Sequence, residues 1–384
     1  MDAYADCATY LPSYASDTSG VCSALYELGG LTVVHDASGC NSTYSTFDEP
    51  RWFKQESAIV ISGLTEMDAI MGDDQKLIDN CIEAAHIYSP NFLALCSSPM
   101  PFVIGTDLPA IGAELEERLG IPVLVIPTNG IHSYIAGCGL AWEALLARFC
   151  QRLPKSPKPS INILGASPLD IENNTLSHLC AWIRSIGFQL GACLALHTSL
   201  EDISSLPKAH ANLVLSSSAL PAARFLTHLC DQPSVLGLPI GSFAPILKER
   251  LWEAVTTKQS FGLTHTGSEA PLVIAGEAIF CASLATALPL PSVLYSPLEC
   301  PPTLLLGKDS GGVEDESKIQ SMMATASVLM GDPFYQVLAP EKRLLAIPHR
   351  AFSGRVFAKD MWNILDPQAF QTRILNPLRE EIAC

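Results

Sequence analysis

The sequence is poor in charged residues and poorest in bases. Of its 384 residues, 16% are charged and 48% are hydrophobic, and 23 Lys and Arg residues stand against 39 Asp and Glu residues. The formal net charge of −16 makes nucleic acid and an anionic membrane face poor partners, whereas a basic protein surface remains a suitable one. The hydrophobic share also excludes a disordered chain, because a chain of this length can bury a large core.

A targeting or membrane segment is also missing. The N-terminal residues MDAYADCATY contain acids where a signal peptide has bases, and no apolar run follows them. The longest weakly charged stretch, residues 271–294, contains Glu277, a glycine and several prolines. It is therefore more typical of a buried strand, helix and loop than of a membrane span. We expect a soluble, cytoplasmic protein.

Thirteen cysteines are present, but the common cysteine motifs are absent. No two cysteines have the CxxC spacing, which excludes a zinc ribbon, a thioredoxin motif and a bacterial ferredoxin motif. The odd number, scattered over a long chain, argues against a disulfide framework. A P-loop is absent too, because Gly307–Lys308 has neither the upstream glycine nor the following Ser or Thr. If ATP drives this protein, a separate protein hydrolyses it.

Short apolar runs alternate with helical patterns along the whole chain, which predicts parallel sheets with helices on both faces. In the first part, four runs are typical of buried parallel strands: residues 31–36, 57–62, 91–96 and 122–127. Helical patterns cover residues 76–88, 110–120 and 133–149. Residues 308–317 are expected to form a solvated loop, and further strands are expected at residues 161–165, 192–196, 212–216, 272–276, 303–307, 327–331 and 344–348.

The composition changes at residues 151–160, which are rich in Pro, Lys and Ser and are typical of a linker. We therefore expect three doubly wound α/β domains of the Rossmann type, at residues 1–150, 161–266 and 267–349. Residues 350–384 are a candidate segment to complete the first of these domains, which also carries the candidate ligands discussed next.

Three cysteines are candidate ligands in this arrangement, because ligands collect beyond the carboxyl ends of parallel strands. Cys40 lies just past the strand at 31–36, Cys96 ends the strand at 91–96, and Cys22 lies in the helical segment before the first strand. Thiolates that meet at such an edge suit an iron–sulfur cluster. The alternative is that all three are plain buried thiols, since cysteine is among the most buried residue types.

The sequence around these cysteines resembles the N-terminal domain of nitrogenase component 1 in three segments, at residues 22–52, 57–84 and 93–111. That family includes the molybdenum–iron protein subunits, cofactor-assembly scaffold subunits and dark-operative protochlorophyllide reductase subunits. The shared features are Gly39–Cys40, the GDDQKL turn at 72–77, and a strand-end cysteine followed by IGTDL at 104–108. The resemblance implies three Rossmann-like domains around a central cleft. It also implies an iron–sulfur cluster, [4Fe–4S] or larger, held at a subunit interface by Cys22, Cys40 and Cys96.

The resemblance continues more weakly into the later part of the chain. Residues 211–226 resemble the segment in which nitrogenase α subunits place the cysteine ligand of their active-site cofactor, but the corresponding residue here is Ser216 or a neighbouring serine. Residues 347–360 resemble the segment with that cofactor's histidine ligand, and His349 is present. Because soft sulfide clusters prefer soft ligands, this serine argues against a nitrogenase-type molybdenum cofactor and against dinitrogen as the substrate.

Three further residues near the candidate cluster site have two interpretations each. Cys138, in the helix at 133–149, could add a cluster ligand, although a helix-packing thiol is the commoner case. His35, in the loop that leads to Cys40, suits either a hydrogen bond to cluster sulfur or one within the loop. His132, near the start of that helix, is equally ambiguous.

The resemblance implies a nitrogenase-like oxidoreductase that receives electrons from an ATP-dependent iron protein. Its unidentified substrate would bind in the central cleft near Ser216 and His349, with His349 as a proton donor or a metal ligand. A cubane cluster takes four ligands and one chain offers three, so we expect a dimer, either with itself or with a homologous subunit. The alternative function is a scaffold or carrier on which a metallocluster is built or held without turnover.

Overall fold

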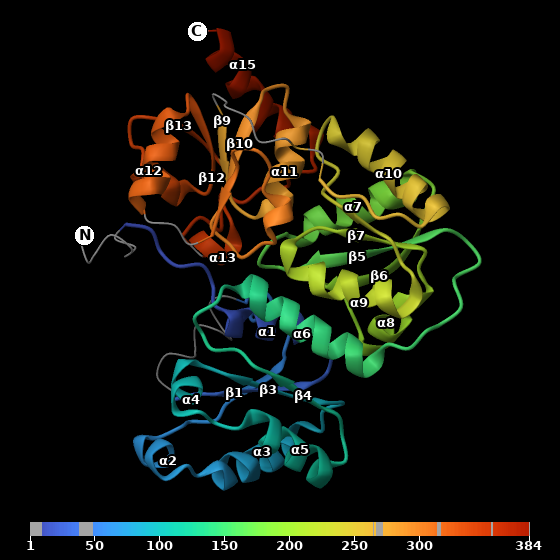
Figure 1. Cartoon of the computed structure of the whole chain (residues 1–384), viewed down its shortest axis with the longest axis vertical. Coiled ribbons are helices and arrows are strands. Elements are labelled where there is room, and N and C mark those ends of the chain that lie inside the picture. Colours follow the sequence, from blue (N-terminus) through green and yellow to red (C-terminus); the bar gives the residue numbers. More distant parts are fainter. Residues whose placement is uncertain are drawn as a thin grey trace.

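The computed structural model describes residues 10–37, 49–263, 265, 272–312, 316–354 and 356–383, so Cys40 lies outside the described residues. The chain forms three parallel sheets, each flanked by helices (Figure 1). The long helix α6 (Tyr134–Phe149) lies between the first sheet and the second. None of the described helices has the length and apolar character that a membrane span requires.

The first sheet has four parallel strands in the order β2–β1–β3–β4. These are β1 (Leu31–His35), β2 (Ala58–Ile61), β3 (Leu93–Ser97) and β4 (Val123–Ile126). One face packs against α3 (Asp74–Tyr88) and α5 (Leu108–Leu119), and the other against α1 (Asp17–Leu25) and α6. Strands β1 and β3 are buried throughout, which explains why their sequences are continuous apolar runs. The short helices α2 (Glu66–Met71) and α4 (Pro99–Ile104) follow β2 and β3.

The second sheet has the order β6–β5–β7–β8, again with every neighbouring pair parallel. Its strands are β5 (Ser160–Ala166), β6 (Gln189–Ala195), β7 (Ala211–Val214) and β8 (Ser234–Leu236). Its helices are α7 (Asn173–Ser185), α8 (Leu200–Ser205), α9 (Leu220–Cys230) and α10 (Phe243–Thr257). The parallel order places the loops that follow β5, β7 and β8 at one edge.

The third sheet has five parallel strands in the order β11–β10–β9–β12–β13. They are β9 (Leu272–Ala275), β10 (Ser292–Ser296), β11 (Ser310–Gly311), β12 (Val328–Gly331) and β13 (Arg343–Ala346). Helices α11 (Ala278–Ala287) and α12 (Glu316–Thr325) lie on opposite faces (Figure 1). The two central strands β9 and β12 are fully buried, as their apolar sequences predict.

The strand expected at residues 303–307 is wrong. That segment begins with the 3₁₀ turn η4 (Pro302–Leu304), because consecutive prolines at 301 and 302 have no N–H to donate to a sheet ladder. The neighbouring strand β11 lies instead in the segment expected to be a solvated loop. The Asp309 carboxylate fixes this connection by accepting hydrogen bonds from the N–H groups of Leu294 (2.9 Å) and Leu306 (3.0 Å).

Helices α1 and α6 cross at very close range. A Cβ atom on Gly137 of α6 would overlap the carbonyl oxygen of Asp17, and one on Gly20 of α1 would overlap the carbonyl oxygen of Tyr134. The missing side chains therefore allow the two backbones to touch. This contact fixes the position of α1, the helix that carries Cys22, relative to the first sheet.

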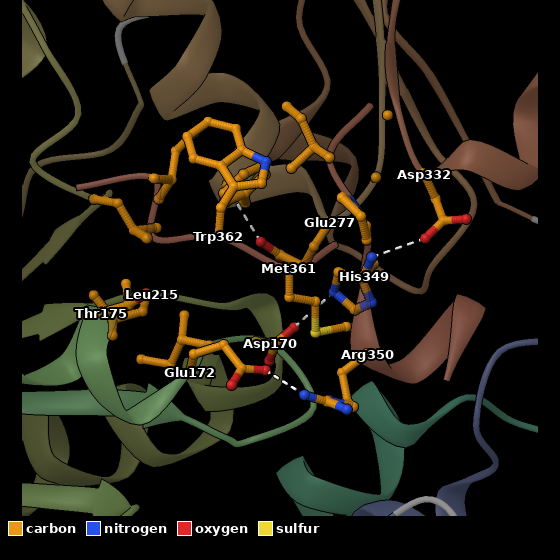
Figure 2. A pocket seen from close by; sticks show the side chains of 18 of the residues that line it. Asp170, Glu172, Thr175, Leu215, Glu277, Asp332, His349, Arg350, Met361 and Trp362 are labelled. Carbon is orange, nitrogen blue, oxygen red and sulfur yellow. Dashed lines mark hydrogen bonds and ion pairs between the residues drawn. The ribbon is translucent and has the colours of Figure 1, made fainter. Parts of the chain in front are cut away.

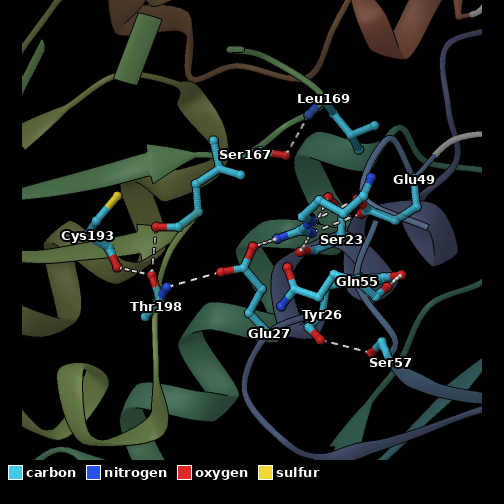
Figure 3. Close-up of polar contacts among 12 residues, drawn as sticks. Ser23, Tyr26, Glu27, Glu49, Gln55, Ser57, Ser167, Leu169, Cys193 and Thr198 are labelled. Atoms are coloured by element: carbon cyan, nitrogen blue, oxygen red, sulfur yellow. Dashed lines mark hydrogen bonds and ion pairs between the residues drawn. The ribbon is translucent and has the colours of Figure 1, made fainter. Parts of the chain in front are cut away.

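A group of buried polar contacts around Arg51 and Glu27 links the first and second sheets; Figure 3 labels Ser23, Glu27, Glu49 and Thr198 among its members. The Arg51 guanidinium donates to both carboxylate oxygens of Glu49, at 2.7 and 2.9 Å, and to Glu27 Oε1 at 3.0 Å. It also donates to the carbonyl oxygen of Ser23 at 2.7 Å. The other oxygen of Glu27 accepts the backbone N–H of Thr198, beyond β6, at 3.2 Å. One guanidinium thus holds helix α1 and the segment before β2 together.

The segment after β13 contacts all three parts of the chain. The carbonyl oxygen of Ala351 accepts the N–H of Ala15 at 2.7 Å, and the N–H of Ala351 donates to Leu169 O at 3.3 Å. Further on, Glu381 in α15 (Asn376–Ala383) forms an ion pair with Arg343 of β13 at 2.5 Å. The C-terminal residues therefore brace the centre of the molecule as well as the third sheet.

Candidate functional site

The structure brings together two of the three predicted cluster ligands. Cys22 lies in α1 and Cys96 in β3, and both side chains are fully buried. Burial raises the pKa of the Cys96 thiol well above its usual range, and the nearby Cys22 and Asp17 raise that pKa further. The Cys96 thiol donates a long hydrogen bond of 3.5 Å to the carbonyl oxygen of Val33. Both thiols lie in one buried core between α1 and the first sheet, and their binding of a cluster stays a prediction.

The third predicted ligand, Cys40, belongs to the residues outside the described ranges. Within those ranges, no group of three or more His, Cys, Asp or Glu side chains is arranged to hold a metal ion. The carboxylate of Asp17 accepts hydrogen bonds of 2.9 Å from the N–H groups of Asn129 and Gly130, and so anchors α1 beside Cys96. The described part of the chain thus contributes two thiols to the predicted cluster site.

The other candidates around this site contact protein atoms. The Cys138 thiol donates to the carbonyl oxygen of Gly20 at 3.2 Å, a contact that matches the helix-packing interpretation. His132 Nδ1 lies 3.4 Å from Glu299 Oε1, and both side chains are exposed. His35 Nδ1 lies 2.8 Å from Ser62 Oγ at the carboxyl edge of the first sheet.

The buried ring of His35 gives the protein a specific pH dependence. Burial lowers the pKa of His35, so the unfolded chain binds this proton more readily than the folded chain. Below about pH 6.5, the ordinary pKa of histidine, this group therefore lowers the free energy of unfolding. We expect His35→Gln to lose stability less steeply than the wild type between about pH 7 and pH 5 in urea denaturation. His228→Gln, which changes an exposed histidine, is the control and should follow the wild type. An equally steep loss of stability in the wild type and His35→Gln would contradict this assignment.

A cleft lies where the carboxyl ends of the second and third sheets face each other (Figure 2). It is narrow, with a cavity volume of about 70 Å³. Loops after β5, β7, β9, β12 and β13 contribute Asp170, Leu215, Glu277, Asp332 and His349. Ligands collect at such an edge in parallel α/β proteins, so this cleft is the candidate substrate site.

A chain of three polar side chains leads into the cleft. The Tyr134 hydroxyl donates to Asp170 Oδ1 at 2.5 Å, and His349 Nε2 lies 3.3 Å from the same oxygen. The backbone N–H of His349 donates to Asp332 Oδ2 at 2.8 Å, which fixes the start of the loop after β13. Burial raises the pKa of Tyr134 well above its usual range, and the Asp170 charge raises it further. Asp170 therefore orients the His349 ring and leaves its Nδ1 atom free of protein partners.

The predicted residue Ser216 lies beside the cleft. Its side chain is fully buried, and its hydroxyl lies 2.9 Å from Ser218 Oγ, while the preceding Leu215 lines the cleft. The next residue, Ser217, donates from its N–H at 2.8 Å and its hydroxyl at 2.5 Å to Glu277 Oε1. Burial raises the pKa of Glu277, and Asp170 raises it further. Ser217, rather than Ser216, thus binds a buried carboxylate at the edge of the cleft.

The cleft residues do not fit a nitrogenase-type molybdenum cofactor. No cysteine is found among the described residues that line the cleft. Four carboxylic acids are present, from Asp170, Glu172, Glu277 and Asp332, against the single guanidinium of Arg350. Sulfide clusters are anionic groups that prefer soft thiolate ligands, so an acidic cleft without thiols is a poor host.

Several cleft residues were absent from the sequence prediction. Asp170 follows the predicted strand at 161–165, so the carboxyl-end rule that identified Cys96 could have found it. Arg350 adjoins His349 and donates to Glu172 Oε1 at 2.6 Å. Trp362 reaches the cleft, and Tyr134 reaches Asp170, through the packing of distant segments, for which the sequence carries no periodic signal.

Comparison with known proteins bears on both fold and family. A family model described as "Nitrogenase component 1 type Oxidoreductase" matches residues 20–245. The solved structure "Nitrogenase Cp1 at pH 6.5" superimposes with a TM-score of 0.69 and 14% sequence identity, covering 98% of this chain and 94% of that chain. The predicted α/β fold, with Rossmann-like parallel sheets, is therefore confirmed.

Three relatives of this chain have different names. The nitrogenase molybdenum-iron protein beta chain of Crocosphaera subtropica is 26% identical over 219 residues, 51% of this chain and 42% of that protein. The nitrogenase iron-molybdenum cofactor biosynthesis protein NifE of Mesorhizobium japonicum is 27% identical over 315 residues, 79% of this chain and 60% of that protein. A subunit of the light-independent protochlorophyllide reductase of Picosynechococcus sp. is 35% identical over 184 residues, 44% of this chain and 36% of that protein. The matches thus cover less than two thirds of each relative.

Proposed function

Because the chain belongs to the nitrogenase component 1 type oxidoreductase family, we propose that it is an iron–sulfur oxidoreductase with its substrate in the cleft. The relatives named as nitrogenase and as protochlorophyllide reductase support an electron-transfer function. The electrons come from an ATP-dependent iron protein, since this sequence has no P-loop of its own. The substrate is not dinitrogen, because the cleft does not fit a molybdenum cofactor.

The cluster is held by Cys22, Cys40 and Cys96. The observation that carries this assignment is the proximity of Cys22 and Cys96, two thiols from separate elements, at the carboxyl end of the first sheet. When bound, such a cluster supplies one-electron transfer at low potential. Three thiols are fewer than the four that a cubane takes, so a second copy or a homologous subunit completes the site.

The chain's own residues supply protons in the cleft. Reduction of a substrate bond by two electrons consumes two protons, and His349 is placed to hold one of them. Asp170 Oδ1 fixes the His349 ring at Nε2, so the Nδ1 atom, which has no protein partner, can accept a proton and pass it to a bound molecule. The apolar walls of the cleft limit access of water to this proton.

A scaffold for metallocluster assembly is the second candidate function. The match to NifE, a cofactor biosynthesis protein, extends over 79% of this chain. A scaffold would accept and release its cluster without turnover of a substrate. A turnover assay with a matching iron protein therefore separates the two functions.

We expect Cys96→Ala to lose most of its iron and acid-labile sulfide after anaerobic purification, because one of three protein ligands is removed. Cys150→Ala is the matched control, since this buried thiol donates to Ile203 O at 3.1 Å, in the second part of the chain. Iron and sulfide analysis of the three proteins provides the measurement. Full iron and sulfide retention in Cys96→Ala would remove the basis of the proposed function.

A further inference from the structure

Buried polar atoms without partners gather in the cleft. In the described residues, eight buried side-chain nitrogen or oxygen atoms make no hydrogen bond, and four of these belong to residues that line the cleft. They are His349 Nδ1, Asp170 Oδ2, Arg350 Nε and Trp362 Nε1. Buried polar groups are normally paired, so such a concentration in one cavity indicates a ligand that pairs with them.

Two of the four unpartnered atoms, His349 Nδ1 and Asp170 Oδ2, are acceptors and define where a ligand must donate, whereas Arg350 Nε and Trp362 Nε1 are donors. Because His349 Nε2 faces Asp170, the neutral ring carries its proton on Nε2 and presents Nδ1 as an acceptor. Asp170 Oδ2 is a second acceptor on a side chain that is only 8% exposed. A ligand that binds between them needs N–H or O–H groups on one end.

The charges in the cleft select against anions. Asp170, Glu172, Glu277 and Asp332 face a single guanidinium, that of Arg350. Arg350 is already paired with Glu172, and backbone N–H groups bond to Glu277 and Asp332. Asp170 has no basic partner besides His349 among the residues described. A positive group beside Asp170 is therefore favoured, and a negative one is opposed.

Most of the remaining wall is apolar. It includes an aromatic face from Phe280 and Trp362 and aliphatic side chains from Leu215, Leu238 and Ile274. Such walls accommodate a flat apolar body whose polar end is fixed by a few groups. Figure 2 shows Trp362 and Leu215 on the wall across from His349 and Arg350.

We propose that the cleft binds an organic cation, an apolar ring whose N–H donors reach Asp170 Oδ2 and His349 Nδ1. This inference rests on the proposed function in that it names the class of molecule the cleft accepts. It does not depend on the cluster, because binding is measured without electron transfer. Iron analysis tests the proposed cluster and the binding measurement tests the cleft ligand, so either proposal can be contradicted without the other.

Three probes of one shape test the proposal by isothermal titration calorimetry on the purified chain. Benzamidine is a cation with N–H donors, benzamide is neutral, and benzoate is an anion. We expect benzamidine to bind at least about tenfold more tightly than benzamide, as charge-assisted hydrogen bonds are stronger, and benzoate to give no binding heat. Equal affinity for benzamidine and benzoate, or no binding of benzamidine, would overturn the proposal.

Asp170→Asn identifies the residue responsible. It keeps the size of the side chain and removes the charge, so benzamidine affinity should fall about tenfold while benzamide affinity changes little. Glu117→Gln, at an exposed position of α5, is the control with the same change of charge. Unchanged benzamidine affinity in a folded Asp170→Asn protein would contradict the assignment. If that variant does not fold, the comparison of probes on the wild type still decides.

Discussion

Replacing Arg51 with alanine is expected to lower the free energy of unfolding by about 3–5 kcal/mol. The guanidinium is buried and forms ion pairs with Glu49 at 2.7 Å and with Glu27 at 3.0 Å. Removing it leaves two carboxylates in the interior with no basic partner in this cluster. Urea denaturation followed by circular dichroism measures the change.

Two controls separate this effect from a general loss of charge. Arg152→Ala breaks an ion pair with Asp231 in which both side chains are exposed, and it should cost less than about 1 kcal/mol. Arg51→Lys keeps the charge but cannot bind both oxygens of Glu49, so it should lie between the wild type and Arg51→Ala. If Arg51→Ala and Arg152→Ala lower the free energy of unfolding by similarly small amounts, the ion pairs of Arg51 do not stabilise the fold.

The ion pairs of Arg51 link the stability of the fold to the candidate iron–sulfur site. Glu49 and Arg51 directly follow the segment that carries Cys40, and Arg51 holds the carbonyl oxygen of Ser23, next to Cys22. The same side chain therefore fixes one end of that segment and the helix with another predicted ligand. Loss of Arg51 is expected to weaken cluster retention along with stability.

The sequence predicts the buried parallel strands well, and the physical reason is local. Strands such as β1 and β3 are covered on both faces, so their sequences, LTVVH and LALCS, are mostly apolar and do not alternate with polar residues. Strand β11 has only two residues and lies at the edge of the third sheet, where such a signal is weak, and residues 303–307 imitate a buried run. There the prolines before the run, rather than its hydrophobicity, decide the structure.

The residues of the candidate sites also fall into two groups, those that the sequence can predict and those that it cannot. Cys96 and Asp170 each follow a strand, and the rule for parallel sheets applies to both from sequence alone. The pairing of Tyr134 with Asp170, and the position of Trp362, depend on helices and loops packed across separate sheets. Such contacts between distant segments leave no spacing pattern in the chain.

Gly137→Ala is expected to lower the free energy of unfolding by about 3 kcal/mol, near the upper end for an overpacked interior. Its Cβ atom would overlap the carbonyl oxygen of Asp17, a backbone atom that cannot turn aside. The loss is expected even though alanine favours a helix over glycine by about 1 kcal/mol. Gly262→Ala, whose Cβ atom would meet nothing within 4 Å, is the control.

The same variant tests whether the contact between α1 and α6 positions the cluster ligands. If α1 shifts to admit the new methyl group, Cys22 moves relative to Cys96, so Gly137→Ala should also retain less iron and sulfide than Gly262→Ala after anaerobic purification. Thermal or urea denaturation and iron analysis on the same samples measure both effects. A variant as stable as the wild type would show that α1 and α6 can separate without cost. A destabilised variant with full iron would show that the position of Cys22 is set by other contacts, such as those of Asp17 with Asn129 and Gly130.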